Sequence, residues 1–154
     1  MTKYLLDTNV ILRFSNPSDK QHNLVVKAVA TLLRQGDTCY LTSQVLIELW
    51  VVATRPIEKN GLGWLPQQAN NIIKQLLQRF PTIEDNPEIF SNWLTLVTTN
   101  QIKGKRTHDI RLIAVMLSSE IDHILTLNPK DFNRIPGITV VHPKDVLDQT
   151  IEFD

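Results

Sequence analysis

Three acidic residues occupy positions where an acid is unusual in a globular protein. Asp7 directly follows an apolar run, Glu48 is the only charge between positions 38 and 54, and Asp109 precedes a mostly apolar stretch. Burying a lone carboxylate is costly or shifts its pKa, and carboxylates that share a small volume repel one another. A divalent cation removes that repulsion, so the three acids together predict a metal site.

The residue types available select the metal. Oxygen ligands favour hard cations such as Mg²⁺ or Mn²⁺ over Zn²⁺. The chain has one cysteine, Cys39, and no histidine spacing of the zinc type. Because carboxylate-bound Mg²⁺ commonly meets a phosphate substrate and assists in-line displacement, the sequence predicts chemistry at phosphorus.

Each acid also has a purely structural interpretation. Asp7 fits a helix N-cap, which stabilises a helix by about 1 kcal/mol. Asp109 fits the first turn of a helix, where the dipole favours an acid by about 0.3–1 kcal/mol. Glu48 fits one helix face from which it reaches solvent, although apolar residues flank it on every side of the helical wheel. The convergence of three separated segments favours the metal site over these alternatives.

The spacing of apolar residues predicts the elements that carry these acids. Short apolar runs predict strands at 3–6, 39–41, 82–84, 123–127 and 138–141, and a Gly-containing loop at 57–65. Helical spacing and cap residues predict helices at 18–34, 43–54, 66–80, 107–121 and 143–147 and one starting at Pro87, with Ser18, Asn86 and Thr107 as caps.

Alternating strands and helices predict an α/β domain. The strands lack strict polar alternation, so we expect a central parallel sheet of four or five strands covered by helices on both faces, within one domain over residues 1–154. Such sheets bind ligands at the carboxyl ends of their strands. Asp7 lies at one of these ends.

Composition excludes several classes of protein. The 154 residues carry 16 basic and 16 acidic side chains, which excludes a polybasic protein that holds nucleic acid by bulk charge. No window resembles a signal peptide or a membrane span. The single cysteine fits a reducing compartment, so we expect a soluble, cytoplasmic protein with no membrane contact.

Four short motifs occur in order along the chain: Leu5-Leu6-Asp7-Thr8-Asn9, Ser43-Gln44-Val45-Leu46-Ile47-Glu48-Leu49, Thr107-His108-Asp109 with Ala114 downstream, and Thr126-Leu127-Asn128-Pro129-Lys130-Asp131-Phe132. They resemble the motifs of PIN-domain ribonucleases. Two further segments, Trp50-Val51-Val52-Ala53-Thr54-Arg55-Pro56 and Asn60-Gly61-Leu62-Gly63, resemble the bacterial VapC-like subgroup of that family. The resemblance extends over essentially the whole chain. It implies a three-layer α/β/α PIN-like fold.

The resemblance also implies an activity and a cofactor. It implies a Mg²⁺- or Mn²⁺-dependent endoribonuclease acting on single-stranded or structured RNA, with Asp7, Glu48 and Asp109 as catalytic metal ligands for one or two ions. The family usually has another Asp near position 128, where this chain has Asn128. An amide carbonyl still ligates Mg²⁺ but brings no charge, and Asp131 either compensates or is structural.

Further residues follow from the same motifs. Thr8 and Ser43 match positions that line the family's site, and Asn9 is expected to hold backbone geometry or a water. Basic residues near the motifs are candidates for contacts to RNA phosphates, with an ordinary solvated loop as the alternative. They are Arg13, Lys103, Lys105, Arg106 and Arg111, and also Lys130 and Arg134.

Three function hypotheses remain at this point. The first is an active ribonuclease, as the toxin of a toxin–antitoxin pair, with a cognate antitoxin and a homodimer as expected partners. The second is a degenerate PIN domain that binds RNA or protein without cleavage, which Asn128 motivates. The third is a phosphotransfer or phosphatase domain, which is disfavoured because position 9 is Asn and not a second Asp.

Overall fold

The computed structural model describes residues 1–133 and 135–153, with side chains described up to residue 149. It contains a five-stranded sheet in the order β3-β2-β1-β4-β5, in which every neighbouring pair is parallel. The strands are β1 (Lys3–Leu6), β2 (Thr38–Thr42), β3 (Thr82–Ile83), β4 (His123–Leu125) and β5 (Thr139–Val141). The predicted parallel sheet of four or five strands is therefore confirmed.

The strand order reverses direction at the centre of the sheet. From β1 the chain builds outward to β2 and β3, then returns past β1 to add β4 and β5 on the other side. Strands β1 and β4 are paired with Leu5 opposite Ile124 and Leu6 opposite Leu125. In open parallel sheets the carboxyl ends at such a reversal diverge to leave a crevice for ligands. The chain therefore has this crevice just beyond Leu6 and Leu125.

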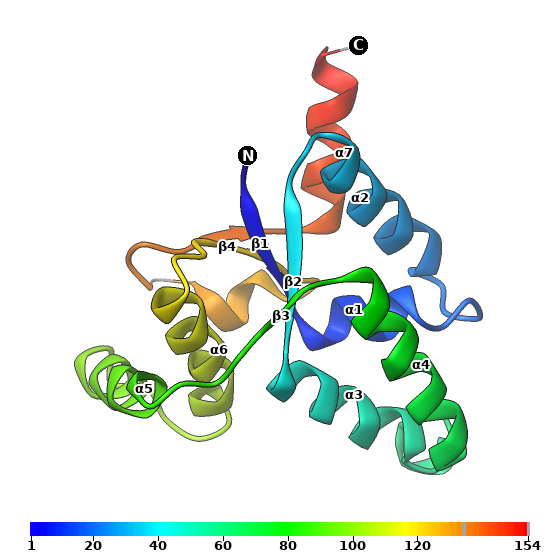
Figure 1. Cartoon of the computed structure of the whole chain (residues 1–154), viewed down its shortest axis with the longest axis horizontal. Coiled ribbons are helices and arrows are strands. Elements are labelled where there is room, and N and C mark those ends of the chain that lie inside the picture. The colour runs from blue at the N-terminus through cyan, green and yellow to red at the C-terminus, as the bar shows by residue number, and fades with distance from the viewer. Residues whose placement is uncertain (134, 154) are drawn as a thin grey trace.

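The helices form layers on both sides of the strands. In Figure 1, α5 and α6 lie on one side of the strands and α1 to α4 lie on the other, with α7 beside α2. The helices are α1 (Thr8–Phe14), α2 (His22–Arg34), α3 (Ser43–Thr54), α4 (Pro66–Arg79), α5 (Glu88–Thr99), α6 (Arg106–Ser118) and α7 (Pro143–Phe153). Two 3-10 helices, η1 (Ile57–Lys59) and η2 (Pro129–Phe132), lie in the connections.

The core explains why the central strands are so apolar. Leu5 and Leu6 of β1, and Ile124 and Leu125 of β4, are fully buried. Strands covered on both faces need apolar side chains at successive positions instead of alternating ones. This packing fixes the ends of β1 and β4 relative to each other, and so fixes whatever side chains follow them.

Two predicted helix starts are wrong. Helix α2 begins at His22 and not at Ser18, because Asn16 and Asp19 hold the preceding residues in turns through bonds from the Ser18 and Gln21 backbone N–H groups. Asn and Asp side chains often compete with helix in this way. Helix α6 begins at Arg106, and the Thr107 hydroxyl donates to the Gly104 carbonyl at 2.7 Å instead of accepting a cap bond. The Asn86 side chain does accept from the Glu88 N–H, at 2.9 Å, as expected of a cap.

Two predicted element ends also differ. Strand β4 stops at Leu125, because the Leu127 N–H leaves the sheet and bonds the Asn9 side chain at 3.0 Å. Helix α7 continues past Leu147 to Phe153, in a stretch that contains neither Gly nor Pro to stop it. The predicted loop at 57–65 contains the single turn η1.

In residues 1–133 and 135–153, the structure contains no helix with the length and hydropathy needed to cross a bilayer.

The start of α3 depends on a buried hydroxyl, which gives a first prediction. Thr42 is fully buried, and its Oγ1 accepts from the Val45 N–H at 3.2 Å. Replacing Thr42 with Val keeps the shape but removes the cap, so we expect the free energy of unfolding to fall by about 1–2 kcal/mol. Urea denaturation followed by circular dichroism measures this change.

A second buried threonine is the matched control for this substitution. Thr31 donates to the Lys27 carbonyl within its own helix at 2.8 Å, so it supports no helix end. We expect Thr31→Val to change the free energy of unfolding by less than about 0.5 kcal/mol. Equal losses in both variants would contradict a capping role for Thr42.

Candidate functional site

Asp7 lies at the crevice between β1 and β4. Its Oδ1 accepts from the Thr8 N–H at 2.7 Å, which caps α1, and its Oδ2 accepts from the Thr126 hydroxyl at 2.8 Å. The side chain is 6% exposed. The pKa of the Asp7 carboxyl is raised to about 6, mainly by burial and also by the charges of Glu48 and Asp131, while the hydrogen bonds from Thr126 and Thr8 oppose the rise. Asp7 therefore caps α1 and is also an acid whose charged form is disfavoured by its surroundings.

Glu48 reaches the same place from α3. Its Oε2 accepts from the Thr8 hydroxyl at 2.6 Å, and its Oε1 accepts from Gln44 Nε2 at 3.1 Å. Thr8 therefore links the two acids, because its backbone N–H bonds Asp7 and its hydroxyl bonds Glu48. Asp7 and Glu48, which the sequence predicts to converge, are therefore both hydrogen-bonded to Thr8.

Asp109 enters from the first turn of α6. The pKa of its carboxyl is raised to about 7. Partial burial is the largest cause, the charges of Asp131, Asp7 and Glu48 add to it, and Arg106 opposes it. An acid that three other acids perturb must lie within their electrostatic range. The structure thus brings together an acidic cluster, by which we mean Asp7, Glu48, Asp109 and Asp131.

The acidic cluster fits a hard divalent cation in its donor chemistry. It offers carboxylate oxygens from four separate segments, which is the donor type that Mg²⁺ and Mn²⁺ prefer. Across the part of the chain that is described, no three His, Cys, Asp or Glu side chains are arranged as a ready-made metal cage. The oxygens of Asp7 and Glu48 point instead to Thr126, Thr8 and Gln44. Each of these carboxylate oxygens keeps a second lone pair beside its hydrogen bond.

Thr126 connects β4 to the acidic cluster. It is fully buried, donates to Asp7, and accepts from the Asn9 side chain at 3.3 Å and the Asn128 N–H at 3.0 Å. Asn9 also accepts from the Leu127 N–H. Asn9 therefore holds the chain that follows β4 in place. The Asn128 side chain is exposed and makes no hydrogen bond to the described residues.

Gln44 connects helix α3 to helix α6 through hydrogen bonds. Its Nε2 donates to Glu48 and to the His108 carbonyl at 2.8 Å, and its Oε1 accepts from Arg111 Nη1 at 3.0 Å. Because Arg111 occupies the amide oxygen, the amide nitrogen must face Glu48 and His108. One amide thus joins α3, which carries Glu48, to the start of α6, which carries Asp109.

Ser43 and Arg111 meet at a fifth acid outside the cluster. The Ser43 hydroxyl donates to Asp85 Oδ2 at 2.9 Å, and Arg111 Nη2 lies 3.4 Å from Asp85 Oδ1. Ser43 therefore borders the site and touches none of the four clustered acids. A cleft of about 280 Å³ is lined by both residues together with Gln44, Ile47, Glu48, Asp85 and His108.

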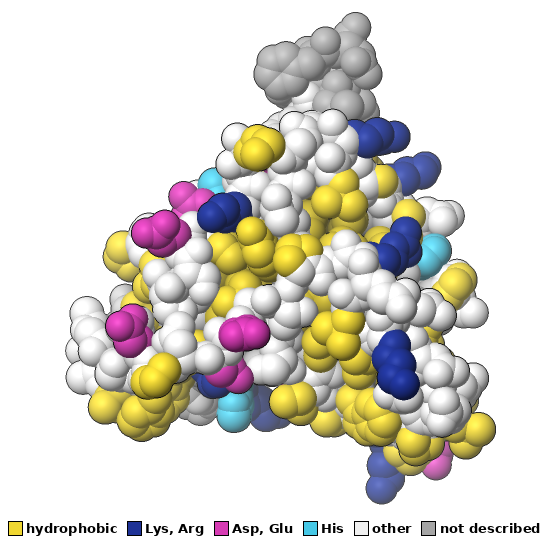
Figure 2. All heavy atoms as spheres, viewed as in Figure 1, with side chains coloured by type: hydrophobic (Ala, Val, Ile, Leu, Met, Phe, Trp, Pro, Cys, Tyr) yellow, Lys and Arg dark blue, Asp and Glu magenta, His cyan; other side chains and the backbone are white. Residues whose placement is uncertain are grey.

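Acidic, histidine and basic side chains gather on the surface at this place. Figure 2 shows them close together at the lower middle of the face, between the α5–α6 pair and α3. Negative and positive groups lie side by side, so the cleft is not uniformly charged. Such a mixture suits a metal cation and an anionic substrate in contact with each other.

The predicted basic residues fall into three groups. Arg106 donates to the carbonyls of Asp131 and Asn133 at 3.3 and 3.0 Å, so it fixes η2 beside α6, and Arg111 lines the cleft. Arg13 faces Asp19 at 3.8 Å and the Asn9 carbonyl at 3.4 Å. The remaining ones, Lys103, Lys105 and Lys130, are exposed, and Arg134 lies outside the described residues.

Sequence reasoning missed Gln44 and Thr126 and undervalued Asp131. Gln44 lies four residues before Glu48, a spacing that places both on one helix face and that could have identified the pair. Thr126 and Asp131 belong to one predicted motif but reveal their roles only through contacts with distant segments. The argument that apolar residues enclose Glu48 was wrong, because Ile47 and Val51 are 64% and 48% exposed.

The acidic crevice at the reversal of a parallel sheet allows comparison with known families. The PIN domain family model matches residues 4–138. The chain belongs to the PIN domain family. The three-layer α/β/α PIN fold expected from the motifs is thus confirmed.

Solved structures share this fold. One is VapBC2 from Rickettsia felis bound to promoter DNA, with 21% identity over 92% of this chain and 98% of that chain and a TM-score of 0.67. Another is VapBC-1 from nontypeable Haemophilus influenzae, with 21% identity over 93% of this chain and 99% of that chain and a TM-score of 0.65. A third is Mycobacterium tuberculosis VapC20, described as a sarcin–ricin loop cleaving toxin, with 16% identity over 79% and 86% and a TM-score of 0.56.

At these identities the likeness extends to the fold, which is that of VapC-type PIN domains. No curated protein sequence matches the chain.

The raised pKa of Asp7 predicts a pH-dependent cost to stability. The pKa is about 6 in the fold, against about 4 in an unfolded chain, so the folded state holds the proton more tightly between these values. Stability from this group is complete below about pH 4 and is lost as pH rises through about 6. We expect Asp7→Asn, which stays neutral, to raise the free energy of unfolding of the metal-free protein at pH 8 by about 1–3 kcal/mol.

Thermal denaturation in a chelator at pH 8 and pH 4 measures this effect. The same variant at pH 4 is the control, because Asp7 is then protonated in the folded wild type and most of the gain must vanish. A variant less stable than wild type at pH 8 would mean that the cap and Thr126 bonds outweigh the charge.

Proposed function

We propose that this PIN domain is a divalent-cation-dependent endoribonuclease that hydrolyses phosphodiester bonds of single-stranded or structured RNA. The observation that carries this proposal is the acidic cluster, in which four segments converge on the crevice between β1 and β4. Burial and the neighbouring carboxylates raise the pKa of Asp7 and of Asp109, which is a cost that a purely structural role does not explain. A cation held between these carboxylates would offset the repulsion among them.

The residues of the cluster have distinct tasks in this proposal. Asp7, Glu48, Asp109 and Asp131 would hold one or two Mg²⁺ or Mn²⁺ ions, which supply Lewis-acid stabilisation of the charge that develops on the phosphate. Thr8 and Thr126 hold Asp7 in place from both of its oxygens. Gln44 holds Glu48 in a fixed position relative to the start of α6 by donating to Glu48 and to the His108 carbonyl. Arg111, at the edge of the cleft, is placed to meet a neighbouring phosphate.

Water is the nucleophile that fits this site. Within the described residues the cleft contains no cysteine, and its one hydroxyl, that of Ser43, is engaged by Asp85. Hydrolysis therefore needs no covalent intermediate on the protein.

Asp131 is the fourth acid of the site in this proposal, in place of Asn128. Of the neighbouring acids, Asp131 raises the pKa of Asp109 the most, and it also raises the pKa of Asp7. Arg106 holds the Asp131 backbone through its carbonyl, so η2 is anchored beside the cluster. Asn128 is an exposed residue whose backbone, and not its side chain, contacts Thr126.

A role as a toxin is the biological context we propose. Several solved structures with this fold are VapBC or FitAB assemblies, and one is a toxin–antitoxin complex from Klebsiella pneumoniae. We propose by analogy that this chain acts as a toxin, pairs with a cognate antitoxin protein and forms a homodimer. Exposed apolar side chains of α3 and α4, and of Leu65 just before α4, supply surface for such contacts; those of the two helices include Ile47, Trp50, Val51 and Leu77.

Metal-dependent RNA cleavage is the test of this function. We expect the purified chain to cleave single-stranded RNA with Mg²⁺ or Mn²⁺ and not with a chelator. Asp7→Asn should lower the rate by more than the 10–100-fold typical of residues that merely support a metal ligand. Gel analysis of end-labelled RNA over a metal series measures the rate, and expression in cells should arrest growth for wild type only.

Thr31→Val is the control variant, because Thr31 is buried in α2 and contacts no clustered acid. RNA binding without cleavage, equal in wild type and Asp7→Asn over all metals and substrates, would favour the degenerate binding module and overturn the hydrolase.

The fourth acid makes a separate prediction. Removing the Asp131 charge weakens the negative potential that attracts the cation, so Asp131→Asn should weaken apparent Mg²⁺ affinity by about 10–100-fold. Raising the Mg²⁺ concentration should recover much of the lost rate. The measurement is the cleavage rate as a function of Mg²⁺ concentration.

Asn128→Ala is the matched comparison, because it alters the other candidate in the same connection. We expect less than a threefold change in the Mg²⁺ midpoint for it. A larger effect from Asn128→Ala than from Asp131→Asn would reassign the fourth ligand position to Asn128.

A further inference from the structure

A second pocket opens beside the active-site cleft, between α5 and α6. Its volume is about 410 Å³, and its lining includes Phe90, Trp93, Thr107, His108 and Arg111. We propose that this aromatic pocket (the Phe90–Trp93 pocket) binds the base of an RNA nucleotide next to the phosphate that is cleaved. The proposal rests on the proposed RNA-cleaving function and adds to it a substrate subsite.

The pocket shares two lining residues with the cleft that contains Glu48. Both cavities are lined by His108 and Arg111, which lie about one turn apart on α6. A strand whose phosphate lies at the acidic cluster would therefore pass these two side chains and bring its adjoining base to the aromatic pocket. This shared wall is the observation that distinguishes the pocket from an isolated apolar patch.

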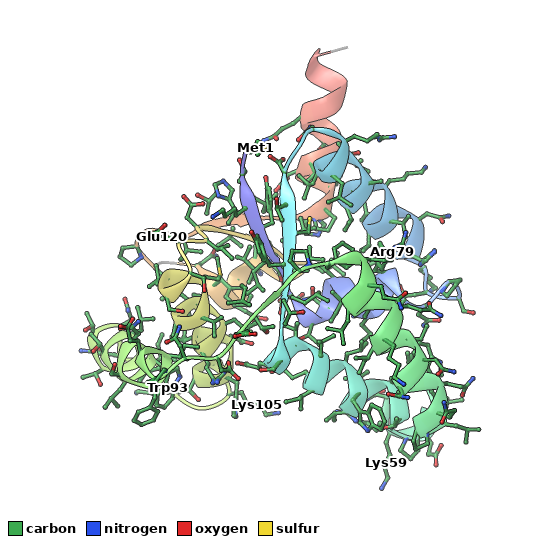
Figure 3. The ribbon with its side chains drawn as sticks, in the orientation of Figure 1. Met1, Lys59, Arg79, Trp93, Lys105 and Glu120 are labelled. Carbon is green, nitrogen blue, oxygen red and sulfur yellow. The ribbon has the colours of Figure 1, made fainter. Side chains whose placement is uncertain are left out.

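The aromatic side chains are held in place and remain accessible. Trp93 Nε1 donates to the Thr107 carbonyl at 2.7 Å, which fixes the indole against the start of α6. Figure 3 labels Trp93 on α5 and Lys105 just before α6, on the same side of the molecule. The Phe90 ring is centred 5.7 Å from the Trp93 ring at 31° and is 67% exposed.

An exposed phenylalanine beside a fixed tryptophan is a stacking platform of the type that unpaired bases use. In Figure 2, hydrophobic side chains cover the surface over α5. A base inserted there would cover apolar area that water now contacts. Stacking tolerates any base, so the pocket predicts preference for unpaired nucleotides and not for one sequence.

Arg111 supplies the electrostatic part of the recognition. It spends one N–H on Gln44 and one on Asp85. A guanidinium has five N–H donors, so it retains others for a phosphate oxygen. An arginine between a metal-binding cleft and an aromatic pocket matches the order of phosphate and base along a nucleotide. This order favours RNA over an apolar protein segment as the occupant.

Trp93 itself provides a probe of occupancy. The chain has three tryptophans, and Trp50→Phe with Trp64→Phe leaves Trp93 as the only one. In a chelator, which prevents cleavage, we expect a short single-stranded RNA to quench Trp93 fluorescence. An oligomer of equal length with abasic sugars, and so with the same phosphates, should quench it much less.

Phe90→Ala tests the same pocket through affinity. We expect it to weaken RNA binding, and to raise KM in cleavage, by about 5- to 100-fold while kcat changes little. Leu94→Ala is the matched control, because Leu94 is also an exposed apolar residue of α5 (49%) and does not line the pocket. It should leave both values within about twofold. Circular dichroism checks that each variant is folded.

The outcomes separate the subsite from the function. Cleavage of RNA with no base-dependent quenching and an unchanged KM in Phe90→Ala would overturn the subsite and leave the ribonuclease intact. Base-dependent quenching without cleavage of any RNA would support the pocket and overturn the ribonuclease. Trp93 quenching that rises with protein concentration alone, and is lost in Phe90→Ala, would assign the pocket to a second copy of the chain and overturn the proposal.

Discussion

Repulsion among four carboxylates at one edge of the sheet is the constraint on which the rest of the structure depends. Glu48, Asp109 and Asp131 lie in α3, α6 and η2, and Asp7 lies between β1 and α1. The most buried of them, Asp7, keeps its position because Thr8 and Thr126 bond both of its oxygens. Packing also contributes, since Leu6 and Leu125, the last residues of β1 and β4, are fully buried.

The hydrogen bonds around the cluster perform two tasks at once. Thr8 starts α1 and joins Asp7 to Glu48, and Gln44 joins Glu48 to the start of α6. Three of these four bonds end on carboxylate oxygens, and the fourth ends on the His108 carbonyl. Each carboxylate oxygen has a second lone pair, so these bonds orient the oxygens of Asp7 and Glu48 without using up their capacity as ligands.

Local patterns determined what the sequence could predict. The parallel sheet and the helices at 43–54 and 66–80 were predictable, because buried strands are short, continuous apolar runs, the 43–54 helix is a longer apolar run, and the 66–80 helix has amphipathic spacing. The early turns before α2 were not predictable from apolar spacing, because the Asn16 and Asp19 side chains decide them. Asp7, Glu48 and Asp109 stood out as charges in apolar runs. Asp131 did not, since its place in the site follows from how Arg106 anchors η2 across 25 positions of the chain.

The zero net charge of the chain is compatible with the proposed anionic substrate. A polybasic protein would hold RNA by bulk charge, whereas this chain has equal numbers of acidic and basic side chains and holds two arginines beside the acidic cluster. Arg106 and Arg111 flank the cluster, and each is held by carbonyl, amide or carboxylate oxygens of the scaffold. An arginine already oriented loses little entropy when it meets a phosphate. In the proposed function, a phosphate of the RNA would therefore bind beside the acidic cluster, where a cation held by the carboxylates would offset their negative charge.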